Sequence, residues 1–141
     1  MSEENVELVR KAFAAFNAFL RGELPSEAAE QFADPKIELI WHGDRTMPDQ
    51  PQHLAGTPAI LGLWEQLRSV WADLAMELLE CIDAPEDHVL IFIRQSGRGR
   101  ESGVPIEFHF FQLVTIRDGR IRRMEFFRHR ADALEAAGLR E

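Results

Sequence analysis

The sequence predicts an α+β fold in which one strongly curved antiparallel sheet wraps around helices and closes into a cone with a cavity. Two helical patterns come first, followed by a single strand pattern and a third helical pattern. The second half of the chain then alternates as four strands separated by turn residues. Separate helical and strand-rich regions of this kind are typical of α+β domains.

Length, composition and charge restrict the class of protein. The 141 residues, 45% of them hydrophobic, fit a single domain over residues 1–141. The formal net charge of -8 has the wrong sign for binding nucleic acid or an anionic membrane. Cys81 is the single cysteine, so no intramolecular disulfide can form and a reducing, cytoplasmic location is expected. An acidic start and the lack of a long apolar run predict neither a signal peptide nor a membrane span.

The first half of the chain contains the three expected helices. The first begins at Ser2 and ends at Gly22, with an apolar stripe of Val6, Val9, Phe13, Phe16 and Leu20. A shorter helix opens at Ser26 and ends before Asp34-Pro35. Residues 37–41 then read as a strand, and residues 42–56 as a long loop of the kind often used as a lid or binding loop. Thr57 and Pro58 start the third helix, whose stripe is Ile60, Leu63, Trp64, Leu67, Val70 and Trp71.

The second half is predicted to form four strands and a closing helix. The strands are expected at residues 74–83, 88–100, 105–117 and 120–128, with Asp118-Gly119 marking a hairpin between the last two. Phenylalanines of the last two strands occupy both parities, which indicates that both faces of the sheet are covered, one by helices and the other by another subunit. A short Ala-rich helix over residues 131–139 is closed by Gly138.

Several segments together resemble the SnoaL-like branch of the nuclear transport factor 2-like superfamily. They are Asp34-Pro35, Gly56, residues 94–99, residues 117–121 and the closing segment 130–139. The resemblance implies a cystatin-like cone with an apolar cavity opening near the long loop, and a homodimer formed through the outer face of the sheet. It implies a small hydrophobic or aromatic metabolite as ligand, and polyketide cyclase, isomerase or dehydratase chemistry as the possible reactions. The chain contains no tyrosine, so reactions in which tyrosines carry the oxyanion site or the dehydration are not expected.

Glu125 and His129 are the candidate catalytic pair. They share one parity of the last strand, so both can point to the same face. If that face lines an apolar cavity, desolvation raises the pKa of the carboxyl and lowers the pKa of the imidazole, which suits an acid and a base. The alternative is that Glu125 pairs with an arginine and that His129 only leads into the last helix.

The candidate ligand-binding residues are spread over several elements. Gln112 lies in the more apolar parity of its strand, where an amide needs a polar partner, and His109 lies in the other parity, so only one of them can face the cavity. The remaining candidates are Trp41 and His42 at the mouth of the cavity, Phe110 and Phe127 on the last strands, and Trp64 on the third helix. Structural packing is the alternative role for each of them.

The sequence predicts no metal and no cofactor. The five histidines show no metal-ligand spacing, and the glycines at 97 and 99 do not open a helix as a phosphate loop would. Three arginines of one strand share a parity: Arg94, Arg98 and Arg100. They either attract a carboxylate-bearing substrate or pair with acidic side chains on neighbouring strands. Three functions remain open: a cofactor-independent acid–base enzyme, a non-catalytic homodimer that binds a small molecule, and an interaction module whose Phe-rich sheet binds another protein.

Overall fold

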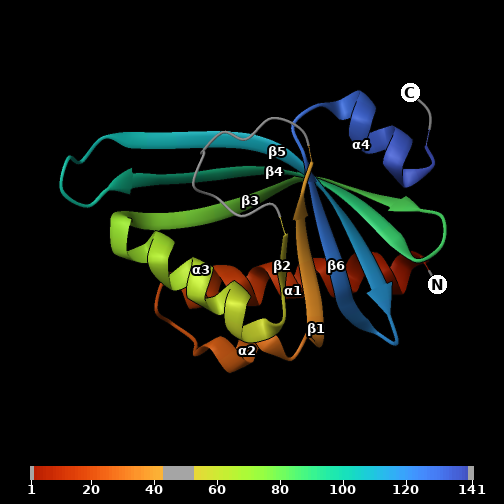
Figure 1. The fold of residues 1–141 in the computed structure, drawn as a ribbon, viewed down its shortest axis with the longest axis horizontal. Coiled ribbons are helices and arrows are strands. Elements are labelled where there is room, and N and C mark those ends of the chain that lie inside the picture. Colours follow the sequence, from red (N-terminus) through yellow and green to blue (C-terminus); the bar gives the residue numbers. More distant parts are fainter. Residues whose placement is uncertain (1, 43–52, 140–141) are drawn as a thin grey trace.

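The computed structural model describes residues 2–42 and 53–139, which form four helices and six strands (Figure 1). In chain order the elements are α1 (Ser2–Leu20), α2 (Ser26–Glu30), β1 (Ala33–Trp41), β2 (His53–Ala55), α3 (Thr57–Val70), β3 (Trp71–Ala84), β4 (His88–Gly99), β5 (Pro105–Arg117), β6 (Arg120–Phe127) and α4 (Arg130–Ala137). The predicted order of helices and strands is therefore confirmed, with β2 as an additional strand inside the predicted loop. Residues 43–52 of that loop lie outside the described residues.

The helices begin and end where the local sequence dictates. Gly22 has a φ of 78°, and its N–H bonds to the carbonyl of Phe19, so a residue without a Cβ ends α1. Gly56, with a φ of 89°, is the N-cap of α3, and Pro58 follows in the first turn. Trp71, expected on the stripe of this helix, instead has extended backbone and pairs with Gly99 as the first residue of β3.

The six strands form one curved sheet in the order β2-β1-β6-β5-β4-β3. Neighbouring strands are antiparallel except β1 and β6, which run parallel. β1 also starts earlier than expected and includes Asp34-Pro35, which the sequence suggested as a break. A register shift between Ala33 and Glu38 accommodates the proline, because a bulge leaves its missing N–H outside the ladder.

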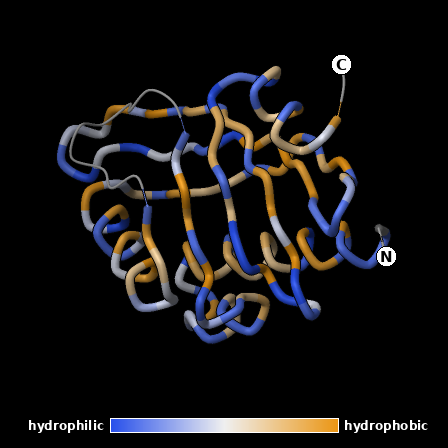
Figure 2. Tube along the Cα trace, turned by 45° about the vertical axis from the view of Figure 1, so that its right-hand side comes forward, coloured by the Kyte–Doolittle hydropathy of each residue, from blue (hydrophilic) through white to orange (hydrophobic). Residues whose placement is uncertain are grey.

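The two faces of the sheet pack against different helices. The inner face meets α1 and α3 and forms the main core, in which Val9, Leu39, Ile91 and Val114 are almost completely buried. The outer face carries a second cluster around Leu113 that is covered by α4. In Figure 1, α4 lies on the opposite side of the sheet from the other helices, and Figure 2 shows the alternation of apolar and polar residues along the strands. The outer face, expected to meet another subunit, is thus covered in part by the chain's own last helix.

Asn17 joins α1 to β3, the outermost strand at one edge of the sheet. Its side-chain Nδ2 donates to the carbonyl of Met76 at 2.7 Å, and its Oδ1 accepts from the N–H of the same residue at 2.8 Å. The amide therefore satisfies both backbone groups that Met76 would otherwise expose at the edge of the sheet. These two bonds set the position of α1 against the inner face.

No helix in the described part of the chain is long and apolar enough to cross a membrane.

Candidate functional site

A single row of side chains crosses the inner face of the sheet. The strand registers align Cys81 with Ile91, Ile91 with Gln112, Gln112 with Phe126, and Phe126 with Trp41. All five side chains point toward α1 and α3, because their strand neighbours in the same parity belong to the main core. Gln112 is the polar member at the centre of this apolar row.

Gln112 is buried and its amide oxygen lacks a partner. The residue is 2% exposed, and its Oε1 makes no hydrogen bond with any described residue. A buried acceptor without a donor costs about 1–3 kcal/mol. Native proteins rarely carry such a group without a reason, so Gln112 marks a position where an additional donor is expected.

Aromatic rings surround Gln112 on the inner face. Trp41 and Phe126 stack with their ring centroids 4.8 Å apart and their planes 5° apart. Phe110 lies beside this pair, 5.5 Å from Phe126 and tilted by 47°. We refer to Gln112, Trp41, Phe110 and Phe126 as the Gln112 site. Its stacked and tilted rings form an aromatic wall next to one amide.

Burial along β5 shows on which side the Gln112 site is open. Val114 is 0% exposed, Gln112 is 2% exposed, Phe110 is half-buried and Phe108, in the same parity, is 39% exposed. The inner face is therefore closed toward the hairpin between β5 and β6 and opens toward the hairpin between β4 and β5. Trp41 and Phe126 are also half-buried, so the aromatic wall is accessible in part.

The helices complete the surroundings of the inner face. Trp64 of α3 is buried and contacts Phe16 of α1 edge to face, with ring centroids 4.5 Å apart. Both rings belong to the main core. Trp64 thus joins the two helices that cover the inner face.

Glu125 lies on the opposite face from Gln112. Its Oε1 is 3.0 Å from Nε2 of His42, and its side chain is 18% exposed. His42 also stacks on Phe127, with ring centroids 4.7 Å apart. The sequence pattern suggested that Glu125 would share a cavity with Gln112 and His129, whereas the structure pairs Glu125 with His42 on the outer face.

A one-residue register shift explains this difference. Near the Asp118-Gly119 turn Arg117 pairs with Arg120, and extending that register would place Gln112 opposite Glu125. A bulge at Thr115–Ile116 shifts the pairing by one residue, so Gln112 instead lies opposite Phe126. Because side chains alternate along a strand, this shift moves Glu125 to the outer face.

The other candidates from the sequence also lie outside the Gln112 site. His129 is exposed and is the N-cap residue of α4, without a side-chain cap bond. His109 is exposed on the outer face, where its ring is 5.8 Å from that of Phe92. Phe127 is buried in the cluster under α4. Of His109 and Gln112, therefore, Gln112 faces inward.

The outer face carries paired charges rather than a basic row. Glu38 accepts a hydrogen bond from Arg123 at 3.0 Å, and this bond lowers the pKa of the Glu38 carboxyl. Partial desolvation opposes the shift, and the charges of Arg122 and His53 favour it. On β4, Arg94 pairs with Glu77, and Arg98 pairs with Asp73 at 2.6 Å. Arg94 and Arg98 therefore pair with acidic side chains on the neighbouring strand, the second of the two roles expected for these arginines.

Cys81 is a half-buried free thiol at the far end of the row through Gln112. Desolvation raises the pKa of the Cys81 thiol, although the charge of Arg10 partly opposes this effect. A thiol with a raised pKa is a poor nucleophile at neutral pH. Cys81 is therefore a structural member of the row.

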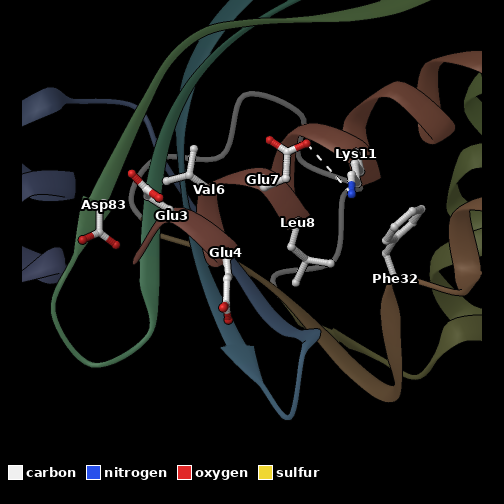
Figure 3. Close-up of a pocket in the computed structure, with 8 residues that line it drawn as sticks. All are labelled: Glu3, Glu4, Val6, Glu7, Leu8, Lys11, Phe32 and Asp83. Carbon is white, nitrogen blue, oxygen red and sulfur yellow. Dashed lines mark ion pairs between the residues drawn. The ribbon is translucent and has the colours of Figure 1, made fainter. Parts of the chain in front are cut away.

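A separate surface depression of ≈ 850 Å³ lies at the start of α1 (Figure 3). Half of its lining residues are acidic, and the lining includes a Glu7–Lys11 ion pair at 4.0 Å; the residues are Glu3, Glu4, Val6, Glu7, Leu8, Lys11, Phe32 and Asp83. The depression is wide open and shares no residue with the Gln112 site. Residues 2–42 and 53–139 contain no group of three His, Cys, Asp or Glu side chains placed to hold a metal ion.

Sequence reasoning missed Phe126 as a member of the site. The parity of β6 was assigned from Glu125, and Phe126 falls in the other parity. The alternation gave no signal, because each parity of β6 holds two apolar residues: Met124 and Phe126 in one, Ile121 and Phe127 in the other.

Comparisons with known proteins agree with this fold. A family model for the SnoaL-like domain matches residues 9–124. Among solved structures, TerC crystallised with polyporic acid is 19% identical, with a TM-score of 0.73, covering 95% of this chain and 97% of TerC. A candidate SnoaL-like polyketide cyclase from Jannaschia sp. CCS1 is 16% identical with a TM-score of 0.70, covering 99% and 95% of the two chains.

A candidate polyketide cyclase from Sinorhizobium meliloti is 24% identical with a TM-score of 0.62, covering 86% of this chain and 94% of its own. No curated protein matches the chain significantly. A further structural match, from Catenulispora acidiphila, is described as having a ketosteroid isomerase-like fold. The family match over most of the chain, together with the curved sheet and its helices, shows that this protein belongs to the SnoaL-like domain family and has the nuclear transport factor 2-like fold.

Proposed function

We propose that the protein binds a small hydrophobic or aromatic molecule at the Gln112 site, between the inner face of the sheet and the helices that cover it. The observation that carries this proposal is the buried Gln112 amide with an unpartnered Oε1 amid aromatic rings. Ligand sites are commonly apolar and contain a few polar groups that orient the ligand. The partial exposure of Trp41 and Phe126 supplies apolar surface for contact.

The family and the neighbouring structures support a small-molecule ligand. TerC was crystallised with polyporic acid, and two other neighbours are described as candidate polyketide cyclases. Because their sequence identities to this chain are low, the ligand of this chain has to be inferred from its own residues. Simple neutral planar aromatic molecules are therefore reasonable first probes.

Binding is favoured over proton-transfer catalysis at this site. The buried polar side chains among the described residues are Gln112 and Thr115, and neither titrates. Glu125, the candidate acid or base, faces away from the Gln112 site and contacts His42. The enzyme alternative, with Glu125 and His129 as its catalytic pair, would need substrate on the outer face instead.

Adjacent phenylalanines provide a matched test. Phe126→Leu removes a ring from the Gln112 site, whereas Phe127→Leu makes the same change one residue later, under α4. Binding of 2-naphthol and of 2-methoxynaphthalene is measured by equilibrium dialysis for both variants and for the unmodified protein. Loss of one aromatic contact is expected to weaken binding about 3–10-fold in Phe126→Leu, with Phe127→Leu unchanged.

Two results would contradict the proposal. One is that neither probe binds the unmodified protein. The other is that Phe127→Leu weakens binding as much as Phe126→Leu does, which would place the ligand on the outer face or indicate only a general loss of stability. Urea unfolding of both variants separates these two explanations, because a stability effect follows the midpoint of unfolding and not the face of the sheet.

We also propose that the protein is a cytoplasmic homodimer that uses the part of the outer face left uncovered by α4. The half-buried Phe92 beside His109 offers an aromatic contact there, and the unpaired Cys81 suits a reducing location. Sedimentation equilibrium is expected to give a dimer that Phe92→Glu converts to a monomer. A monomer at all concentrations would contradict the dimer.

A further inference from the structure

We propose that the ligand is electrically neutral and planar, and that it donates a hydrogen bond from a hydroxyl or N–H group to Oε1 of Gln112. This inference rests on the proposed function, because it specifies the chemical class of molecule that the Gln112 site takes. It derives from three properties of the described residues: an unused acceptor, the charge of the surroundings and the shape of the aromatic wall.

The unused acceptor determines which polar group the ligand carries. An amide oxygen can only accept, and Oε1 of Gln112 has no donor among the described residues. A ligand with a hydroxyl or N–H removes the penalty of the unpaired oxygen when it binds. A ligand that can only accept a hydrogen bond leaves Oε1 of Gln112 unpaired, and its own acceptor atom would then face this oxygen. The site therefore discriminates between a donor and its methylated counterpart.

The charge of the surroundings determines that the ligand is neutral. Among the described residues no Asp, Glu, Lys, Arg or His side chain is buried, and the half-buried thiol of Cys81 is neutral because desolvation raises its pKa. The polar helix residue Asn17 is neutral, and its Nδ2 and Oδ1 each bond to the backbone of Met76. Gln95, which pairs with Phe108 on the same inner face, is half-buried and neutral. A buried carboxylate or ammonium on the ligand would consequently lack a counter-charge, which is costly.

The aromatic wall determines the shape of the ligand. The planes of Trp41 and Phe126 differ by 5° and the two rings are stacked on each other, so the free face of the stack is a single flat layer. Phe110 closes one side at a tilt of 47° to Phe126. A flat ring system keeps contact with this layer while its polar edge reaches Gln112, which lies directly beside Phe126 in the register.

Three probes that differ in one substituent test the inference. They are 2-naphthol, which donates and is neutral; 2-methoxynaphthalene, which only accepts; and 2-naphthoate, which is charged. Equilibrium dialysis at pH 7 measures each probe on the unmodified protein, on Gln112→Met and on Thr115→Val. Thr115→Val is the matched control, because Thr115 is the other buried polar residue with an unpartnered oxygen and it lies on the outer face.

The expected result is a ratio of affinities that depends on Gln112. The unmodified protein and Thr115→Val should bind 2-naphthol about tenfold more tightly than 2-methoxynaphthalene, the ratio that one buried hydrogen bond supplies. In Gln112→Met the ratio should fall to about 1, since only a weakly accepting thioether sulfur remains. The charged 2-naphthoate should bind most weakly to all three proteins.

The outcomes separate this inference from the proposed function. If no probe binds, or if Phe126→Leu has no effect on any of them, the proposed function itself fails. If the two neutral probes bind the unmodified protein equally and Phe126→Leu weakens both, the site is real but the donor inference is wrong. Tighter binding of 2-naphthoate than of 2-naphthol would contradict the inference that the ligand is neutral. An unchanged ratio in Gln112→Met would place the donor contact elsewhere.

Discussion

Replacing Gln112 by Met should make the protein without ligand more stable. The side chain is 2% exposed and its Oε1 has no partner, so the folded state carries the cost of an unpaired buried acceptor, about 1–3 kcal/mol. Met has the same unbranched shape and no polar atom, so the substitution keeps most of the packing. Allowing for imperfect packing, we expect a gain of about 1 kcal/mol, or about 3 °C in Tm for a chain of this length.

Urea unfolding followed by circular dichroism measures this gain as a higher midpoint with an unchanged slope. Thr115→Val is the control for a buried unpartnered oxygen on the other face, and it should gain stability by a similar amount. Only Gln112→Met should also lose the preference for a donor-bearing probe. A loss of more than about 1 kcal/mol in Gln112→Met would refute the reasoning, because it would show that the amide is a satisfied structural group.

The remaining predictions concern groups outside the Gln112 site. In Glu125→Gln the affinity for 2-naphthol, measured by equilibrium dialysis, should stay within about twofold of that of the unmodified protein, because Glu125 faces outward. A loss of about tenfold would indicate that Glu125 contributes to the Gln112 site. Arg123→Gln should lower stability by about 0.5–1 kcal/mol at pH 7, as expected for a partly exposed pair. The hydrogen bond from Arg123 lowers the pKa of Glu38, so this contribution is present above about pH 4.5 and is lost as the pH falls through the folded pKa. Urea midpoints at pH 7 and pH 3 check this, and an equal effect at both values would contradict it. Cys81 should react with a disulfide reagent at pH 8 more than about tenfold slower than in urea, because burial raises its pKa; equal rates would contradict this assignment.

Much of the fold could be predicted because its signals are local. Helical stripes, Asp118-Gly119 and the alternation of the last four strands each act over a few residues, and the structure places those elements close to the expected bounds. The strand β2 was missed because it has only three residues and depends on pairing with β1. The parallel pairing of β1 with β6 is a long-range contact that no local pattern encodes.

The candidate site was predicted only in part. Gln112 was expected in the more apolar parity of β5, since an amide among phenylalanines is recognisable from sequence, and the structure buries it on the inner face. The face of Glu125 depends on a single bulge between β5 and β6, and a shift of one residue exchanges the two faces of a strand. Alternation within β6 could not reveal this bulge, so the pairing of Glu125 with His42 was accessible only from the structure.

A crystal structure grown with 2-naphthol would show directly where a neutral aromatic donor binds. We predict its hydroxyl about 2.7 Å from Oε1 of Gln112, with its rings against Trp41 and Phe126. Density for the naphthol beside His42 and Glu125 on the outer face, or in the depression near Glu7 and Lys11, would contradict the assignment of the Gln112 site.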